Sequence, residues 1–292
     1  MNKFLSVAGR LYPILPQLLR FAQFPLRHLH AAPCVSKYRT THKTLIILLL
    51  TGMWGVAPAD VADTLASIKP SVVGVGTIHP TRSPRARLMG TGFVVGDGKY
   101  VISSDHIFTG VLDSEKNENW AVLTGRDRQM TVRNATIVMR DKARDLILLR
   151  IEGEPLPALK LAPSDTVREG WQLYFTGYPI GAILGLNPST HRAGLAAIVP
   201  IYTPVPSAFQ LNARVLRQAN AQYEIYELDA IAYPGNSGSP VWHPETGEVL
   251  GVVNSVFLKG AKETALSAPS GITYAIPVKW VRELLRDAAS RP

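Results

Sequence analysis

The sequence predicts an all-β fold of two antiparallel six-stranded β-barrels, with a short helix before them and a helix after them. Short runs rich in β-branched and aromatic residues follow one another along the chain and are separated by turn residues. No long helical pattern lies between consecutive runs, which argues against strands that alternate with crossover helices. Residues 152–170 separate two sets of six runs, so we place the barrels at about 70–155 and 168–277.

A short helix is predicted over residues 59–70, and it must end at Pro70 because proline cannot continue it. The first barrel is expected to use the runs at 71–77, 90–96, 100–104, 121–125, 130–140 and 145–151. The second barrel is expected to use the runs at 171–177, 194–202, 223–232, 239–242, 248–257 and 271–276.

The chain is predicted to close with a helix over 278–289, with Pro277 at the first helical position. Five apolar residues then recur at helical spacing and share one face: Val278, Val281, Leu284, Leu285 and Ala288. The longest irregular stretch is the loop at about 203–222. Its Arg214 and Arg217 are interpreted as part of a solvated face.

The composition is that of a globular protein, since 46% of the 292 residues are hydrophobic and 18% are charged. The single cysteine, Cys34, excludes a disulfide framework and a cysteine-based zinc site, and we expect no metal and no cofactor. Residues 1–59 hold seven cations and no acid, which leaves 24 cations against 22 acids over residues 60–292. The net charge of +9 therefore belongs mostly to this leader, and we expect no nucleic-acid partner.

Residues 1–59 are interpreted as a leader whose segment 45–59 resembles a secretory signal. An apolar run over 45–56 follows three cations, and Ala57-Pro58-Ala59 supplies small residues at the expected cleavage site. The run has 12 residues, whereas a transmembrane helix needs about 20, so we favour cleavage after Ala59 and expect no integral membrane span in the mature form. The alternative is an uncleaved anchor formed by residues 45–56.

The first 36 residues are longer than the basic region of an ordinary signal, which leaves two interpretations. Either translation starts downstream of Met1 in a bacterial protein exported to the periplasm or secreted, or the leader directs the chain to the mitochondrial intermembrane space. We favour bacterial export because the leader has only two serines, Ser6 and Ser36, whereas transit peptides are usually serine-rich.

The segment Pro234–Pro240 (PGNSGSP) lies between two predicted strands and suits a nucleophilic serine with an oxyanion hole. Ser237 is the candidate nucleophile, and the backbone of Gly235, Asn236 and Ser237 is the candidate oxyanion hole. The N–H groups of Gly235 and Ser237 would face the substrate carbonyl. Gly238 is expected to allow a close approach of the neighbouring strand.

A serine hydroxyl is a weak nucleophile and needs a nearby base and an anion that holds the base. His106 follows a predicted strand at a turn, and Asp145 begins an apolar strand that would bury its carboxylate. The order His106, Asp145, Ser237 is one of the known triad orders. Asp105 is expected to cap the turn around His106, where it would also add a second negative charge beside the imidazole.

With these residues in place, the chain resembles trypsin-like serine proteases of the HtrA/Deg type. Six motifs carry the resemblance in collinear order over about 70–285: Pro70–Val73, Gly90–Phe93, Asp105–Phe108, Asp145–Leu148, Pro234–Pro240 and Thr273–Pro277. The resemblance implies the two-barrel chymotrypsin fold, with the site in the cleft between the barrels and polypeptides as substrates.

The resemblance also implies a specificity pocket with Ile231 at its base, six residues before the nucleophile. Asn254, Ser255 and Val256 would form one wall of this pocket. Two departures from the family pattern are Ser239 in place of a glycine and Asp105 in place of a neutral residue. Only 15 residues follow Pro277, so we expect no PDZ domain.

We therefore predict an exported serine endopeptidase, with a role in envelope protein quality control. Two alternatives stay open. One is a catalytically silent scaffold that binds a partner through its cleft or the 203–222 loop. The other is a protease like the secreted glutamyl endopeptidases, which share the GNSGSP form, although the closing segment favours the HtrA-like branch. His79, His191 and His243 are expected to be solvated at the surface, and the sequence does not indicate an oligomeric state.

We expect the recovered protein to begin at or near Asp60 and to lie outside the cytoplasm, because of the apolar run and the small residues that follow it. N-terminal sequencing of the protein from fractionated cells measures both properties. A cytosolic chain that begins at Met1 would contradict this expectation.

Overall fold

The computed structural model describes most of the chain beyond the leader. The described residues are 60–125, 130–163, 166–181, 185–201, 223–254 and 271–291. The leader, the 203–222 loop with Arg214 and Arg217, and the predicted pocket residues Ser255 and Val256 lie outside them. No helix in the described ranges is long and apolar enough to span a membrane.

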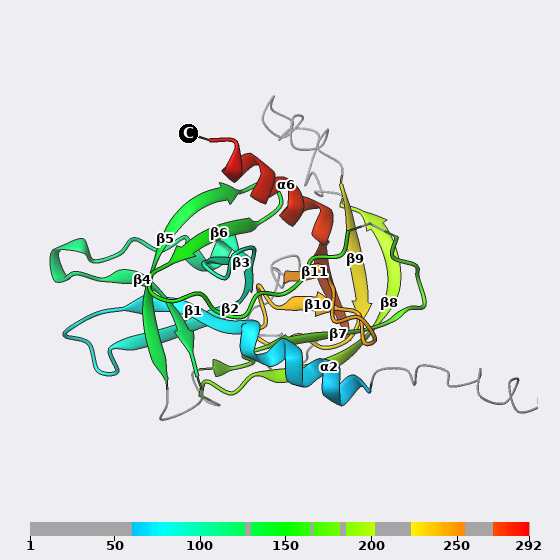
Figure 1. The fold of residues 1–292 in the computed structure, drawn as a ribbon, viewed down its shortest axis with the longest axis horizontal. Helices are drawn as coiled ribbons and strands as arrows, with labels where there is room; N and C mark the ends of the chain where they lie inside the picture. Colours follow the sequence, from blue (N-terminus) through cyan, green and yellow to red (C-terminus); the bar gives the residue numbers. More distant parts are fainter. Residues whose placement is uncertain are drawn as a thin grey trace, which may run out of the picture. The chain divides into compact units, whose positions relative to one another are not determined.

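The strands form two closed six-stranded antiparallel barrels, as the sequence predicts (Figure 1). The first barrel contains β1 (Val72–Ile78), β2 (Ala86–Val95), β3 (Tyr100–Ser104), β4 (Asn119–Thr124), β5 (Thr131–Asp141) and β6 (Leu146–Ile151). The second contains β7 (Gln172–Gly177), β8 (Ser189–Pro200), β9 (Glu224–Asp229), β10 (Pro240–Trp242), β11 (Val249–Asn254) and β12 (Ile272–Pro277).

The two barrels share one topology. The strand order is β1-β2-β3-β6-β5-β4 in the first barrel, and β7, β8, β9, β12, β11 and β10 follow the same order in the second. Pairing of β1 with β4 closes the first barrel, and pairing of β7 with β10 closes the second. The third and sixth strands of each barrel are therefore neighbours although they lie far apart in sequence.

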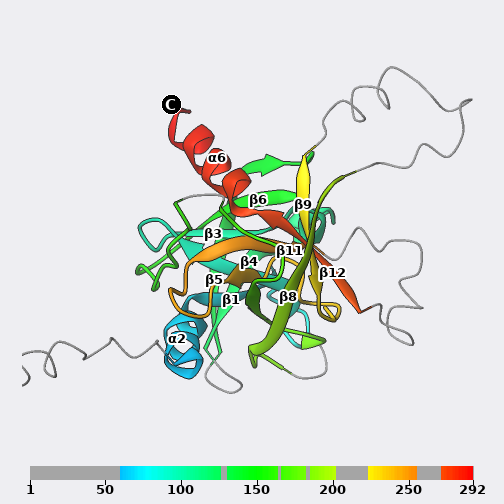
Figure 2. The ribbon, with the colours of Figure 1, turned by 90° about the vertical axis from the view of Figure 1, so that its right-hand side faces the viewer.

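Two helices flank the barrels, also as predicted. Helix α2 (Val61–Ile68) begins at Asp60, whose carboxylate accepts a hydrogen bond from the N–H of Ala62, and a 3₁₀ turn over Lys69–Ser71 follows it. Helix α6 (Val278–Ala289) has the predicted bounds, but Pro277 precedes it and is not its first residue, because Pro277 keeps an extended backbone as the last residue of β12. Figure 2 shows α6 leaving β12 toward β6.

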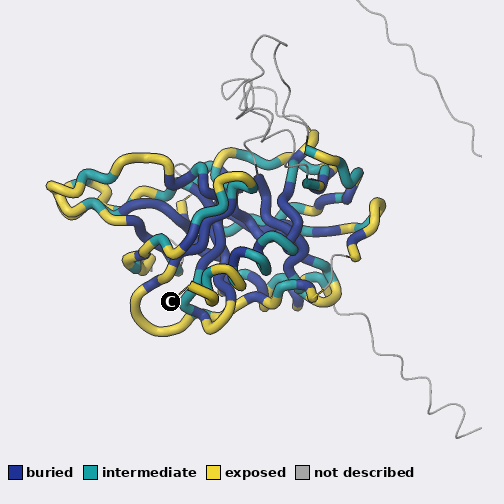
Figure 3. Tube along the Cα trace, turned by 90° about the horizontal axis from the view of Figure 1, so that it is seen from above, coloured by how far each residue is buried: buried dark blue, intermediate teal, exposed yellow. Residues whose placement is uncertain are grey.

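Both faces of β1, β3 and β6 are largely buried, which explains the near-continuous apolar runs of these strands. Val73, Val75 and Val94 belong to one hydrophobic cluster confined to the first barrel. The alternating residues, such as Phe93, join a larger cluster that also contains Trp242 of the second barrel. Figure 3 shows the buried residues concentrated along the strands and the exposed residues along the connections. The barrels therefore pack together through apolar side chains.

Candidate active site

His106 and Asp145 are brought together by the pairing of two neighbouring strands. His106 lies in the 3₁₀ turn η2 (Asp105–Phe108) directly after β3, and Asp145 directly precedes β6. Since Ser104 of β3 pairs with Leu146 of β6, Asp105 and Asp145 lie side by side, and the N–H of Asp105 donates to the carbonyl of Asp145 at 3.1 Å. His106 is the next residue of the turn. The Nδ1 atom of His106 lies 2.6 Å from Oδ2 of Asp145, and Oδ1 of Asp145 accepts the backbone N–H of His106 at 2.7 Å.

Asn254 supplies a contact that sequence reasoning missed. Its side-chain amide donates a hydrogen bond to Oδ2 of Asp145 at 2.9 Å, and the residue is only 1% exposed. The contact joins β11 of the second barrel to Asp145 in the first, in addition to the place in a pocket wall that the resemblance implies for Asn254. Both carboxylate oxygens of Asp145 are therefore occupied, which fixes the side chain in one orientation.

The turn between β5 and β6, which carries Asp145, is held from several sides. Asp145 itself has a φ of 55°, an uncommon value for a residue other than glycine. The preceding Arg144 donates to Asp141 at 2.8 Å and stacks on the ring of Trp280 in α6, with its guanidinium carbon 3.6 Å from the ring centroid. The final helix therefore helps to hold the backbone that positions Asp145.

Tyr223 also stabilises the turn between β5 and β6. Its hydroxyl donates to the carbonyl of Ala143 at 3.2 Å. Burial, with the carboxylates of Asp141 and Asp145 nearby, raises the pKa of Tyr223 to about 12. The hydroxyl therefore keeps its proton and remains a donor at neutral pH.

The loop that carries Ser237 joins β9 to β10 and docks on both barrels. The N–H of Thr91 in β2 donates to the carbonyl of Ser237 at 3.0 Å, and the N–H of Gly238 donates to Val253 at 2.9 Å. Gly238 has a φ of +86°, and a Cβ atom there would lie 2.0 Å from the carbonyl oxygen of Thr91. The predicted close approach at Gly238 is confirmed, and only glycine fits it.

Gly235 also has the left-handed backbone that the sequence suggested, with a φ of +103°, and a Cβ atom there would meet the carbonyl oxygen of Tyr178 at 2.2 Å. Its carbonyl accepts the hydroxyl of Thr91 at 2.7 Å. The N–H groups of Gly235 and Ser237 form no hydrogen bond with the described residues, so both are free to bind a carbonyl oxygen. The N–H of Asn236 donates instead to Tyr233 at 3.0 Å, so Asn236 is not available as an oxyanion donor, contrary to its predicted place in the hole.

Ser237 is 7% exposed, and its hydroxyl forms no hydrogen bond with His106 or any other described side chain. Its carbonyl is nevertheless fixed on β2, next to the strand that leads into the His106 turn. Contacts between a nucleophile and its base are often long in unliganded enzymes and shorten when substrate binds.

Asp105 does not cap the turn around His106, so that prediction is wrong. Ser104 is the residue that precedes the turn, and no side chain caps it. The carboxylate of Asp105 instead accepts Arg140 of β5 at 2.6 Å, and the same guanidinium donates to the carbonyl of Phe108 at 3.0 Å. Since Arg140 balances the charge of Asp105, this carboxylate does not act on His106 as an unpaired anion. The pair instead ties both ends of the turn to β5.

His191 is not solvated at the surface, contrary to expectation. It lies half-buried on β8, its ring is stacked on Phe175 with a centroid distance of 4.8 Å, and its Nε2 is buried without a hydrogen-bond partner among the described residues. Burial lowers the pKa of His191, which keeps the ring neutral. It therefore packs as an aromatic residue of the second barrel.

The fold and these residues place the chain in a known family. The model of the trypsin-like peptidase domain matches residues 90–252, which is more than half of the chain. The protein belongs to this family of trypsin-like peptidases.

No group of histidine, cysteine and acidic side chains in the described part could hold a metal ion.

Two kinds of relative are similar to this chain. Mitochondrial serine protease HTRA2 of Drosophila pseudoobscura pseudoobscura is 28% identical over 238 residues, which cover 79% of this chain and 48% of the relative. A protein of Hahella chejuensis named probable periplasmic serine endoprotease DegP-like is 26% identical over 213 residues, which cover 73% of this chain and 38% of the relative. The chain thus spans about half or less of the length of these curated relatives.

Solved structures show the same fold. The inactive form of the Rv3671c protease of M. tuberculosis has a TM-score of 0.56 and 22% identity, with 81% of this chain and 100% of that chain covered. The HtrA-type protease AlgW with a tripeptide has a TM-score of 0.55 and 22% identity, with 80% and 64% covered. The predicted trypsin-like fold is therefore confirmed, and the relatives named HTRA2 and DegP-like bear out the predicted resemblance to HtrA-type proteases.

Replacement of Arg140 by methionine should lower the free energy of unfolding by about 3 kcal/mol, because it leaves the buried carboxylate of Asp105 without its partner. Urea denaturation of the protein measures this loss. The double variant Arg140→Met, Asp105→Asn should regain much of the stability, since it removes the unpaired charge. A single variant as stable as the wild type would contradict the role given to this ion pair.

Proposed function

We propose that the protein is an exported serine endopeptidase in which Ser237, His106 and Asp145 act as a catalytic triad. One observation carries the proposal: the hydrogen-bonded pair His106 and Asp145 on the first barrel faces the same inter-barrel seam on which the Ser237 loop docks. The family match and the names of the relatives support a serine peptidase.

In the proposed mechanism, Ser237 attacks the carbonyl carbon of the scissile peptide bond while Nε2 of His106 takes the hydroxyl proton. Asp145 holds Nδ1 of His106 and stabilises the imidazolium that forms. Asn254 keeps the Asp145 carboxylate in place from the opposite barrel. The imidazole of His106 must be neutral to accept the proton.

Negative charge develops on the substrate oxygen in the transition state, and the free N–H groups of Gly235 and Ser237 are suited to receive it. His106 then donates its proton to the leaving amine, which leaves an acyl-enzyme on Ser237. Water activated by His106 hydrolyses this ester and restores the hydroxyl.

The cellular role is proposed from the leader and the relatives. The predicted signal at 45–59 favours export, and the printed names of the relatives include periplasmic and mitochondrial proteases. Polypeptides of the envelope are the proposed substrates, with protein quality control as the proposed process.

The specificity pocket is proposed to accept small and medium aliphatic side chains. Ile231 takes the position at its base and is 36% exposed, so an apolar side chain is available there. A lysine or arginine of the substrate would leave its charge without a partner, which is unfavourable.

Ser237→Ala and His106→Ala should each lower kcat for a casein-type substrate by about three orders of magnitude or more, because the triad acts as a unit. The double variant should lose little more. Hydrolysis by the purified full chain and its variants measures these effects. Wild-type activity in Ser237→Ala would show that another group is the nucleophile.

A phosphonofluoridate activity probe separates the endopeptidase from a silent scaffold with the same fold. The proposal requires covalent labelling of the wild type and none of Ser237→Ala. A folded wild type that the probe does not label would favour the scaffold.

Peptide-library profiling should show cleavage after Val, Ala, Leu or Ile. Ile231→Asp should shift the preference toward Lys or Arg, since it supplies a counter-charge. Val138→Asp is a matched control, because Val138 is a similarly exposed apolar residue on β5 of the first barrel and 37% exposed. A dominant wild-type preference for Lys or Arg would overturn the pocket assignment, and a preference for Glu would favour the glutamyl-endopeptidase alternative.

A further inference from the structure

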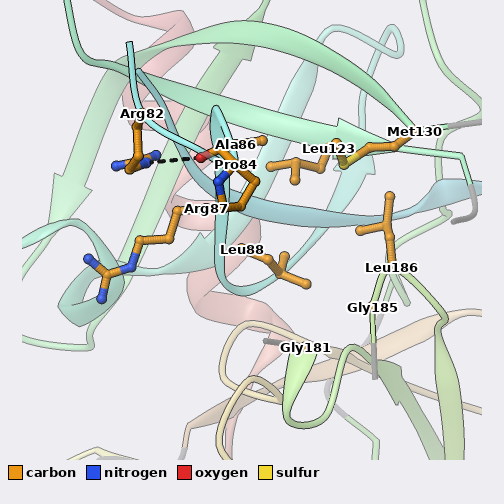
Figure 4. Close-up of a pocket in the computed structure, with 10 residues that line it drawn as sticks. All are labelled: Arg82, Pro84, Ala86, Arg87, Leu88, Leu123, Met130, Gly181, Gly185 and Leu186. Atoms are coloured by element: carbon orange, nitrogen blue, oxygen red, sulfur yellow. Dashed lines mark hydrogen bonds between the residues drawn. The ribbon is translucent and has the colours of Figure 1, made fainter. Parts of the chain in front are cut away.

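A pocket of about 570 Å³ lies between the two barrels, outside the triad (Figure 4). Its walls come from three places: the β1–β2 hairpin, the region of β4 and β5, and the turn after β7. The lining is mostly apolar and includes Leu88, Leu123, Met130 and Leu186, with Gly181 at the edge. The volume lies within the range of about 300–1,000 Å³ that is usual for ligand sites. We call it the Leu88 pocket.

Two arginines line the Leu88 pocket, and they differ in whether their guanidinium groups already have partners among the described residues. Arg82 is occupied, because it pairs with Glu118 at 2.8 Å and donates to the carbonyl of Thr77 at 3.1 Å. Arg87 is exposed, and its side chain has no ion pair or hydrogen bond with the described residues. The pocket thus offers an apolar floor and one unpaired cation at its margin.

Residues close to the pocket lining contact the backbone of the Ser237 loop on two sides. Leu88 lies on the same face of β2 as Thr91, since they pair with Gly76 and Gly74 of β1, and the hydroxyl of Thr91 donates to the carbonyl of Gly235 at 2.7 Å. On the other side Gly181 follows Ile180, whose N–H donates to the carbonyl of Pro234 at 2.6 Å. The β1 partners of Leu88 and Thr91 are two residues apart, a span of about 7 Å, so an extended substrate that passes the Ser237 loop reaches the pocket within about two to four residues of the scissile bond.

We propose that the Leu88 pocket is a substrate subsite remote from the scissile bond. It takes an aliphatic or aromatic side chain of the polypeptide among Leu88, Leu123 and Leu186, and an adjacent carboxylate of the substrate lies against Arg87. We assign a polypeptide substrate to the pocket for two reasons. The unpaired Arg87 complements a substrate carboxylate, and residues close to the pocket lining contact the Ser237 loop. This inference rests on the proposed function, since it extends the substrate preference of the same protease.

Peptides that share one scissile sequence and differ only at flanking residues test the subsite. The first peptide carries the pair Phe-Glu two to four residues from the cleaved bond, the second carries Phe-Lys there, and the third carries Gly-Gly. Each peptide is made in two forms, with the pair either before or after the cleaved bond. In one of these two forms, kcat/KM for the Phe-Glu peptide should exceed kcat/KM for the Gly-Gly peptide by about tenfold. Arg87→Gln should lower the Phe-Glu value about threefold and leave the Gly-Gly value unchanged. Leu88→Gln should abolish the advantage.

Arg85→Gln is the matched control, since Arg85 is a neighbouring exposed arginine that does not line the pocket. A short substrate that ends before the pocket should be cleaved equally by all four proteins. Equal kcat/KM values for the three peptides in the wild type would overturn the subsite while leaving the proposed protease intact.

Binding provides a readout that does not need turnover. A fluorescent Phe-Glu peptide should bind the full chain carrying Ser237→Ala, and Leu88→Gln in that background should weaken binding about tenfold. Unchanged binding in Leu88→Gln would overturn the subsite. A concentration-dependent dimer that Leu88→Gln dissolves would also overturn it, because a second copy would then occupy the pocket. Failure of the wild type to cleave the short substrate would instead contradict the proposed function.

Discussion

The candidate site depends on one buried threonine that joins the two barrels. Thr91 is fully buried on β2, and its N–H donates to the carbonyl of Ser237 while its hydroxyl donates to the carbonyl of Gly235. The same hydroxyl accepts the N–H of Tyr178 at 2.9 Å, and the Thr91 carbonyl accepts the hydroxyl of Ser103 at 2.6 Å. The residue thus fixes the Ser237 loop of the second barrel on the first barrel, on the strand next to the one that leads to His106.

A second hydrogen bond between the barrels positions a residue of the first barrel from the second. Asn254 of the second barrel donates to Asp145 of the first, so each barrel contributes a residue that positions a group on the other. The order of the site is therefore coupled to the packing of the barrels. Near it, Ser239 and the side-chain amide of Asn236 are buried without hydrogen bonds to described residues, a cost that proteins accept mostly at functional sites.

Much of this architecture could be predicted, because the information is local. The alternation of apolar runs and turn residues defined the barrels, and the PGNSGSP segment together with His106 and Asp145 defined the candidate triad. Two of the contacts that the sequence did not indicate have partners distant in sequence. Asp105 looked like a turn cap from its neighbours, but its partner Arg140 lies 35 residues away, and the partner of Asn254 lies 109 residues away. Local reasoning cannot supply such pairings. The register of two closed barrels creates them.

A crystal structure of the protein after reaction with a peptide phosphonate tests the central claim most directly, because the adduct mimics the tetrahedral intermediate. A covalent bond is expected from Oγ of Ser237 to phosphorus, with a phosphoryl oxygen within hydrogen-bond distance of the N–H groups of Gly235 and Ser237. Nε2 of His106 should lie beside the adduct, with Nδ1 still on Asp145. An adduct on another residue, or a phosphoryl oxygen held away from Gly235, would contradict the account.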